Sequence, residues 1–153
     1  MNWEENTAMK QNEINTTEVD KKIVKEFRTK TDRLFDREPL YGMSPTCIEK
    51  IVREMVLDIV KNFELDVTLE DVIVSGSRCR GLEKAESDID IVVSYSGSER
   101  EDTFFNLINE ERMTIEGLEI DINPINTEYT GNLSDYLLGV EKYFSEKASK
   151  TSV

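Results

Sequence analysis

The chain contains no histidine, and this absence removes several kinds of active site together. Without histidine there is no Ser-His-Asp triad, no Cys-His dyad and no zinc site built on imidazole ligands. Cysteine is nearly as scarce, with Cys47 and Cys79 as the only two. The first residues contain no apolar segment typical of a signal peptide, so we expect both thiols to stay reduced in a cytoplasmic protein.

Long apolar runs and positive charge are also missing. No stretch approaches the roughly 18 apolar residues of a membrane-spanning helix, so no membrane partner is expected. The 19 lysines and arginines are outnumbered by 32 aspartates and glutamates, and the net charge is −13. Nonspecific binding to duplex DNA needs a basic surface and is therefore not expected. A nucleotide substrate stays open, because a nucleotide can bring its own metal ion.

The 153 residues are enough for one domain with flexible ends. Residues 1–18 are polar and lack any period, so we expect a disordered N-terminal tail, and residues 148–153 predict a loose C-terminal tail. Between them, residues 19–147 are expected to form a single domain. It consists of an extra N-terminal helix at 19–36, a core at 45–125 and a C-terminal helix at 132–147.

Apolar periodicity predicts the order of the elements. Helical spacing is strongest over residues 46–63, and β-branched runs predict strands that begin at Val72 and Ile89. The expected order is helix, helix, strand, strand, helix, strand, helix. This order predicts an α/β (α+β) sandwich, in which a small mixed sheet of three to five strands is flanked by helices.

The most informative stretch is residues 71–95, which read DVIVSGSRCRGLEKAESDIDIVVSY. A buried strand leads into a glycine turn, a polar connection follows, and a second strand opens with Asp88 and Asp90. Side chains on a strand alternate between faces, so both carboxylates are expected on the same side. Two like charges held side by side repel each other, and a divalent cation offsets that repulsion.

A third acid follows on a later apolar segment. Asp121 lies among aliphatic residues that precede Asn123-Pro124, and Glu119 on the same face is the competing choice. Three convergent carboxylates offer the hard oxygen ligands that Mg²⁺, or Mn²⁺, prefers. The candidate metal ligands are therefore Asp88, Asp90 and Asp121.

These residues together resemble the nucleotidyltransferase superfamily of the DNA polymerase beta type. In that family a strand ends in Gly-Ser, roughly ten residues follow, Asp-x-Asp opens the next strand, and a third Asp comes later. Here the matching residues are Gly76-Ser77, Asp88, Asp90 and Asp121, and the resemblance covers about residues 45–125. The segments GSRCRG and SDIDIVV resemble those of the minimal nucleotidyltransferase domain proteins, including the antitoxin-like ones, and of the kanamycin-type antibiotic nucleotidyltransferases. The resemblance implies the nucleotidyltransferase fold.

The resemblance also implies nucleotide-binding roles for the glycine turn. Gly76 lets the backbone approach a ligand closely, and Ser77 with the amides after it can donate to phosphate oxygens. Arg78 and Arg80 are local cations that would meet the β- or γ-phosphate of a nucleoside triphosphate.

Each feature also has a purely structural interpretation. The glycine-serine pair alone is more often a turn, and Asp88 can cap a turn while Asp90 faces solvent. The two arginines can pair with neighbouring acids instead of phosphate, the available partners being Glu83, Glu86 or Glu70. The aromatic residues of the later helices are more often core than stacking platforms; they are Phe104, Phe105, Tyr136, Tyr143 and Phe144.

The predicted function is transfer of a nucleoside monophosphate from a nucleoside triphosphate, such as ATP, to a hydroxyl on a protein, an RNA or a small molecule. Two Mg²⁺ ions would support the in-line displacement. Only about 30 residues follow Asp121, too few for the acceptor-binding domain of larger relatives. The acceptor site is therefore expected to be missing, to be supplied by the N-terminal helices, or to be supplied by a helical partner protein. The alternative is a noncatalytic binding module, such as an antitoxin-like regulator or an acidic inhibitor.

Overall fold

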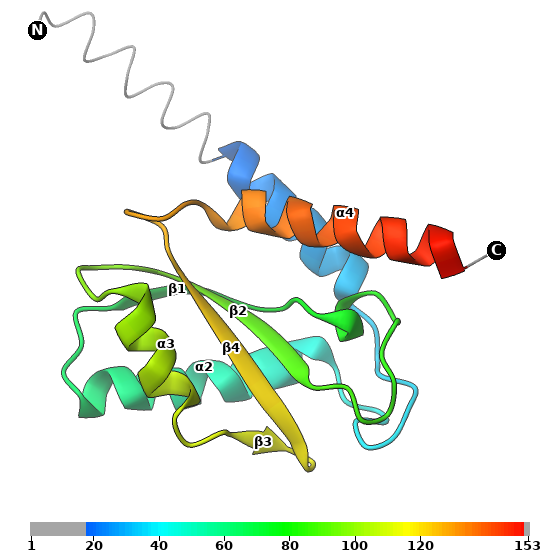
Figure 1. The fold of residues 1–153 in the computed structure, drawn as a ribbon, viewed down its shortest axis with the longest axis horizontal. Coiled ribbons are helices and arrows are strands. Elements are labelled where there is room, and N and C mark those ends of the chain that lie inside the picture. The colour runs from blue at the N-terminus through cyan, green and yellow to red at the C-terminus, as the bar shows by residue number, and fades with distance from the viewer. Residues whose placement is uncertain (1–17, 152–153) are drawn as a thin grey trace, which may run out of the picture.

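A four-stranded sheet forms the centre of the computed structural model, which describes residues 18–151, with side chains up to residue 147 (Figure 1). Most of the tail predicted at 1–18 lies outside the described residues. The strands are β1 (Thr68–Val74), β2 (Ile89–Ser96), β3 (Thr114–Ile115) and β4 (Leu118–Asn126). The predicted mixed sheet of three to five strands is confirmed.

The strands lie in the order β1-β2-β4-β3. β1 pairs antiparallel with β2, β2 pairs parallel with β4, and the short β3 pairs antiparallel with β4. The parallel pair requires a crossover, and α3 (Glu101–Asn109) provides it between β2 and β4. The residue before β2 and the first residues of β2 therefore come to lie next to the first half of β4.

Helices cover both faces of the sheet (Figure 1). α2 (Pro45–Asn62) and α3 pack on one face, where the Tyr95 ring meets the Phe104 ring edge-on at 4.9 Å between centroids. On the other face lie a helix formed by residues 18–31 and α4 (Leu133–Thr151), joined by an Asp20–Ser134 hydrogen bond of 2.6 Å. No helix in the described part of the chain is long and apolar enough to cross a membrane.

The start of α2 follows directly from its sequence. The Ser44 hydroxyl accepts a hydrogen bond from the Cys47 amide at 3.1 Å, and Pro45 occupies the first helical position, where no donor is lost. Ile48, Val52 and Val56 recur at four-residue spacing and are buried. Their stripe anchors α2 against the sheet.

Two predicted helix ends differ from the structure. The helix expected at 19–36 ends at residue 31, where the hydroxyls of Thr29 and Thr31 bond to carbonyls four residues earlier and compete with the helix. The C-terminal helix runs past the predicted end at 147 to Thr151, because residues 147–151 include no glycine or proline that would end it. The loose tail predicted at 148–153 is therefore helical as far as residue 151.

Side chains close the outer edge of β4, which β3 covers only at its start. Asn109 at the end of α3 accepts from the Ile122 amide at 3.1 Å and donates to the Ile122 carbonyl at 2.9 Å. Pro124 has no amide proton, and Glu101 accepts from the Asn126 amide at 3.1 Å. An edge closed in this way does not offer a row of free donors to another strand.

Candidate functional site

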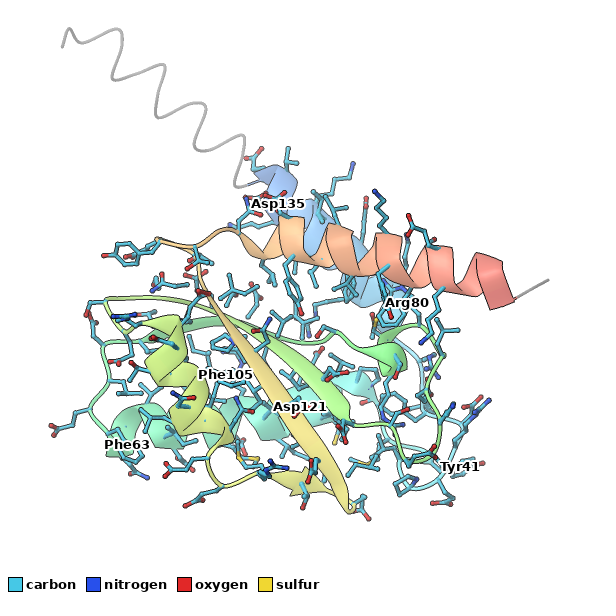
Figure 2. The ribbon with its side chains drawn as sticks, viewed as in Figure 1. Tyr41, Phe63, Arg80, Phe105, Asp121 and Asp135 are labelled. Atoms are coloured by element: carbon cyan, nitrogen blue, oxygen red, sulfur yellow. The ribbon has the colours of Figure 1, made fainter. Side chains whose placement is uncertain are left out.

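Asp90 and Asp121 are direct neighbours across the two central strands. Asp90 is the second residue of β2, Asp121 lies in β4, and the parallel register pairs them with each other. Paired positions of adjacent strands are about 4.8 Å apart and project to the same face. Asp88 immediately precedes β2, so all three predicted metal ligands gather at one end of the sheet. Figure 2 shows Asp121 on β4, beside β2.

Charge repulsion and burial act on Asp90. Burial raises the pKa of Asp90 above its ordinary value, and the charges of Asp121 and Asp88 raise it further. The guanidinium of Arg78 partly opposes this rise in pKa. A nearby cation would stabilise the ionised form of Asp90, because it would offset both the repulsion from the other acids and the lost hydration.

Asp121 experiences the same kind of environment at the more exposed end of the cluster. Its pKa is raised, first by burial, and then by the charge of Asp88 and a hydrogen-bonding contact with it. Glu119, the competing choice for a third ligand, is exposed and lies 3.6 Å from the Arg112 guanidinium. Asp121 is thus the acid that interacts with the other two.

The three carboxylates are neighbours, yet they do not form a closed ligand set. Within residues 18–147, no three Asp, Glu, Cys or His side chains are already arranged to hold a metal ion. Asp88 and Asp121 are exposed, whereas Asp90 is partly buried. Asp90 is therefore the member of the three that is most enclosed by the protein.

The glycine turn presses directly against Asp90. The Ser75 amide donates to the Asp90 carbonyl at 2.9 Å, and a β-carbon added to Gly76 would lie 2.0 Å from Asp90 Oδ2. The φ angle of Gly76 is −87°, which any residue adopts, so the close approach rather than the backbone conformation requires glycine. Ser77 then opens a single 3₁₀ turn, η1 (Ser77–Cys79).

A cavity of about 410 Å³ opens between this turn and the helices above the sheet. Gly76, Asp90 and Asp121 line one part of it, and the rest is mostly apolar, with Phe105 from α3 among its lining residues (Figure 2). The other lining residues include Asn123, Tyr136, Val140 and Phe144. A polar, acidic end and an aromatic wall thus share one cavity.

Only some of the aromatic residues that are expected in the core are buried there. Phe104 and Phe144 are buried, whereas Phe105 is 46% exposed and Tyr143 is exposed as well. Adjacent helical residues point about 100° apart, so Phe104 and Phe105 cannot both face the same core. That spacing is the signal that would have identified Phe105 as a candidate lining residue.

Arg78 lies behind the site rather than in it. Its side chain is 1% exposed, and Nη2 donates to the Ser87 carbonyl at 2.7 Å and to the Lys84 and Ala85 carbonyls at 3.3 and 3.4 Å. The predicted phosphate contact and the alternative pairing with a nearby glutamate both differ from this arrangement. Backbone carbonyls are the hydrogen-bond partners instead.

Arg80 connects the turn to the helices that cover it. Its Nη1 donates to the Thr31 hydroxyl at 2.7 Å, its guanidinium forms an ion pair with Glu141 of α4, and its Cζ lies 4.3 Å from the centre of the Phe27 ring. Figure 2 shows Arg80 beneath α4. All three contacts are with the 18–31 helix and α4. The alternative prediction that Arg80 pairs with Glu83, Glu86 or Glu70 is therefore wrong.

Glu83 pairs instead with a residue that the sequence analysis did not single out. Arg33 Nη2 lies 3.1 Å from Glu83 Oε1 and also donates to the Arg78 carbonyl at 3.0 Å. Arg37 donates to the Glu83 carbonyl at 3.1 Å.

Burial raises the pKa of the Cys79 thiol to about 11, so this cysteine is a core residue and not a nucleophile.

Comparison with known proteins supports one family. The family model of the nucleotidyltransferase domain matches residues 50–143, which is more than half of the chain. The match includes the glycine turn, all three carboxylates and the first half of α4. No curated protein and no solved structure matches the chain. On its sequence and its fold, the chain belongs to the nucleotidyltransferase domain family.

Proposed function

We propose that the protein transfers a nucleoside monophosphate from a nucleoside triphosphate to a hydroxyl acceptor, with Mg²⁺ or Mn²⁺ held by Asp88, Asp90 and Asp121. The observation that carries this proposal is the pairing of Asp90 with Asp121 directly beside the Gly76 turn. Carboxylates and a close-approach glycine at the mouth of one cavity suit a phosphate with its counter-cation.

The chemistry of the donor set agrees with a hard divalent cation. The carboxylates of Asp90 and Asp121 have raised pKa values, to which burial contributes most and the neighbouring charges add. A cation at their midpoint would relieve both effects. Since Asp88 and Asp121 are exposed, their rotation towards the cation costs little packing.

The turn is proposed to bind the phosphate groups through its backbone and through Ser77. The absent side chain at Gly76 lets the backbone of the turn lie directly against the Asp90 carboxylate, and so brings the turn close to the proposed cation. Arg78 and Arg80 support the turn from behind, because Arg78 donates to the Ser87 carbonyl and Arg80 donates to Thr31 and pairs with Glu141. Their contribution is therefore to the shape of the turn rather than to direct phosphate contact.

The proposed reaction is an in-line displacement at the α-phosphorus. The acceptor oxygen forms a bond to the α-phosphorus while the bond to the bridging oxygen breaks, and pyrophosphate leaves. Asp121 accepts the hydroxyl proton, since its carboxylate is the most exposed of the paired acids and its pKa is raised. When bound, the divalent cations stabilise the attacking and leaving oxygens.

The aromatic wall of the cavity is proposed to hold the nucleoside. Phe105 and Tyr136 line the same cavity as the carboxylates and offer apolar surface to a base or a ribose. Such stacking tolerates any of the four bases, so the assay below includes all four nucleotides.

The test is label transfer from α-labelled ATP, CTP, GTP or UTP, with Mg²⁺ or Mn²⁺, into protein, RNA and small molecules of a cell lysate. We expect transfer by the wild-type protein and none by Asp88→Ala or Asp90→Ala. Asp121→Ala should also lose transfer, while Glu119→Ala, two residues away on the same strand, should keep it.

Absence of transfer with every nucleotide, together with absence of metal and nucleotide binding by titration, would contradict the proposal. That result would favour a noncatalytic binding module on the same fold. Transfer that survives in Asp121→Ala but disappears in Glu119→Ala would instead reassign the third ligand. Label found on a helical protein that co-purifies would identify the acceptor as a partner protein.

A further inference from the structure

The segment between η1 and β2 has no regular secondary structure, yet it carries one of the three acids. Asp90 and Asp121 are fixed by the register of two strands, but Asp88 lies one residue outside β2. Its position therefore depends on the conformation of the preceding residues, 84–87.

Residues 84–87 form a turn that is closed on itself. The Lys84 amide donates to the Ser87 hydroxyl at 2.9 Å, and the Ser87 amide donates to the Lys84 carbonyl at 3.1 Å. These bonds define the shape of the turn. They do not attach it to the rest of the molecule.

Arg78 makes that attachment. Its Nη2 donates to the carbonyls of Lys84, Ala85 and Ser87, of which the bond to Ser87 is the shortest at 2.7 Å. The arginine is itself fixed, because it is 1% exposed and its own carbonyl accepts from Arg33 at 3.0 Å. One rigid, planar group thus connects the η1 turn, next to Gly76, with the residue directly before Asp88.

The buried charge of Arg78 also lies near the acids. Burial lowers the pKa of Arg78 below its ordinary value, and the negative charges of Glu83, Asp88 and Asp90 act in the opposite direction. The cation therefore sits behind the carboxylates, on the side away from solvent. It orders the acids without occupying the open side on which a metal ion would bind.

We propose that Arg78 is a positioning residue, which holds the 84–87 turn through its three carbonyls and thereby places Asp88 beside Asp90. The part of this inference that concerns metal affinity rests on the proposed function. The part that concerns the conformation of the turn does not. Two separate measurements therefore test it.

The first measurement is amide hydrogen exchange of residues 84–88, which is independent of any metal. In Arg78→Met we expect the hydrogen-bonded amides of Lys84 and Ser87 to exchange at least tenfold faster than in the wild type, with little change in the paired residues of β2 and β4. Arg78→Lys should behave like Arg78→Met, because one ammonium cannot reproduce the planar fork of the guanidinium. Val56→Ala, a core truncation in α2, is the control for general destabilisation.

The second measurement is Mn²⁺ affinity by electron paramagnetic resonance, recorded well below the melting temperature of each variant. Arg78→Met and Arg78→Lys should bind Mn²⁺ at least tenfold more weakly than the wild type, and Val56→Ala should bind it equally well. If Arg78→Met does not fold, Arg78→Lys and Ser87→Ala test the same turn. Ser87→Ala removes the hydroxyl that accepts from Lys84, and it should raise the exchange rate of the turn by a smaller factor.

The results separate the two proposals. Wild-type exchange rates for residues 84–88 in both Arg78 variants would overturn the positioning role, whatever the metal result. Full recovery in Arg78→Lys would show that charge alone suffices, and would also overturn it. If the Arg78 variants exchange faster but the wild type binds no Mn²⁺, the positioning role is retained and the proposed metal site is contradicted.

Discussion

The two faces of β2 differ in what their side chains do. One face carries only large apolar residues, all of them at most 1% exposed, namely Ile89, Ile91, Val93 and Tyr95. The opposite face of the same strand carries Asp90, Val92, Ser94 and Ser96. A single strand therefore supplies core packing and polar chemistry from alternate residues.

The helices that cover these two faces differ in the same way. α2 and α3 pack against the apolar face, and the rings of Tyr95 and Phe104 are in direct contact there. Two hollows lie over the other face, of about 790 and 410 Å³. The larger hollow, lined by the 18–31 helix and the start of α4, reaches Ser94, and the smaller one, lined by α4 and Phe105, reaches Asp90. One face is therefore closely packed, whereas the other leaves space beside polar side chains.

The largest expected effect is on the polar face. Asp90→Asn should reduce nucleotide transfer by about 1,000-fold, or ~4 kcal/mol of transition-state stabilisation, because the amide cannot ligate a hard cation as the carboxylate does. The protein should stay folded, as judged by circular dichroism. A transfer rate within a few-fold of the wild type would show that the polar face has no catalytic role.

The neighbouring residue on the apolar face should give the opposite result. Ile91→Ala removes a side chain that is 1% exposed, and it should lower the free energy of unfolding by about 3–4 kcal/mol through lost burial and the cavity left behind. Urea titration measures this loss. The Mn²⁺ affinity of the molecules that remain folded should be unchanged, and an equally large loss of affinity would remove the distinction between the faces.

Gly76→Ala tests the contact between the turn and the polar face. The added β-carbon would lie 2.0 Å from Asp90 Oδ2, so either the turn or the carboxylate must move. A displacement of about 1 Å should reduce transfer by about 100-fold. Gly139→Ala, in α4 with open space around the added carbon, is the matched control and should leave transfer unchanged.

The smallest expected effect is a pH dependence of stability in the metal-free protein. Asp90 has a pKa above its ordinary value of 3.8, mainly because it is buried, so the folded state binds this proton more tightly than the unfolded state. The stabilisation is complete below pH 3.8 and is lost as the pH rises through the raised pKa. Asp90→Asn should therefore become more stable than the wild type towards neutral pH, as measured by denaturant titration at several pH values.

Asp66 supplies a control of opposite sign. Hydrogen bonds from Ser98 lower the pKa of this exposed carboxylate, so its contribution is present above pH 3.8 and lost as the pH falls. Asp66→Asn should therefore lose stability relative to the wild type towards neutral pH. Parallel pH profiles for the two variants would contradict the assignment of Asp90 as a destabilised carboxylate.

Much of this arrangement could be predicted from local sequence patterns. The β-branched run at Val72 and the alternation around Asp90 identify strands, and the four-residue spacing from Ile48 onwards identifies α2. The spacing of Gly76, Asp90 and Asp121 carries the family resemblance. These features are local, so each can be recognised from a few residues.

The partners of the two arginines could not be predicted in the same way. Arg78 donates to backbone carbonyls, which every residue possesses and which leave no pattern in a sequence. Arg80 meets Thr31 and Glu141, which are 49 and 61 positions away and come together only in the folded chain. Glu83 is close in sequence to both arginines and was therefore a natural candidate partner, but its carboxylate pairs with Arg33 instead.

The cavity wall was missed for a related reason. An amphipathic stripe predicts that residues such as Tyr136 and Phe144 face the sheet, but it does not show where the two layers separate. The gap arises because α4 and α3 approach the sheet from opposite faces, with Phe105 near its edge. Only the three-dimensional arrangement places these side chains beside Asp90.

The most direct test of the account is the thermal unfolding of the metal-free protein with and without Mg²⁺. A Mg²⁺ concentration tenfold above the dissociation constant would stabilise the folded state by about 1.4 kcal/mol. The predicted result is a rise of a few degrees in the melting temperature of the wild type and no rise in Asp90→Asn. Equal melting temperatures for the wild type with and without millimolar Mg²⁺, or the same rise in both proteins, would contradict a metal site at the paired carboxylates.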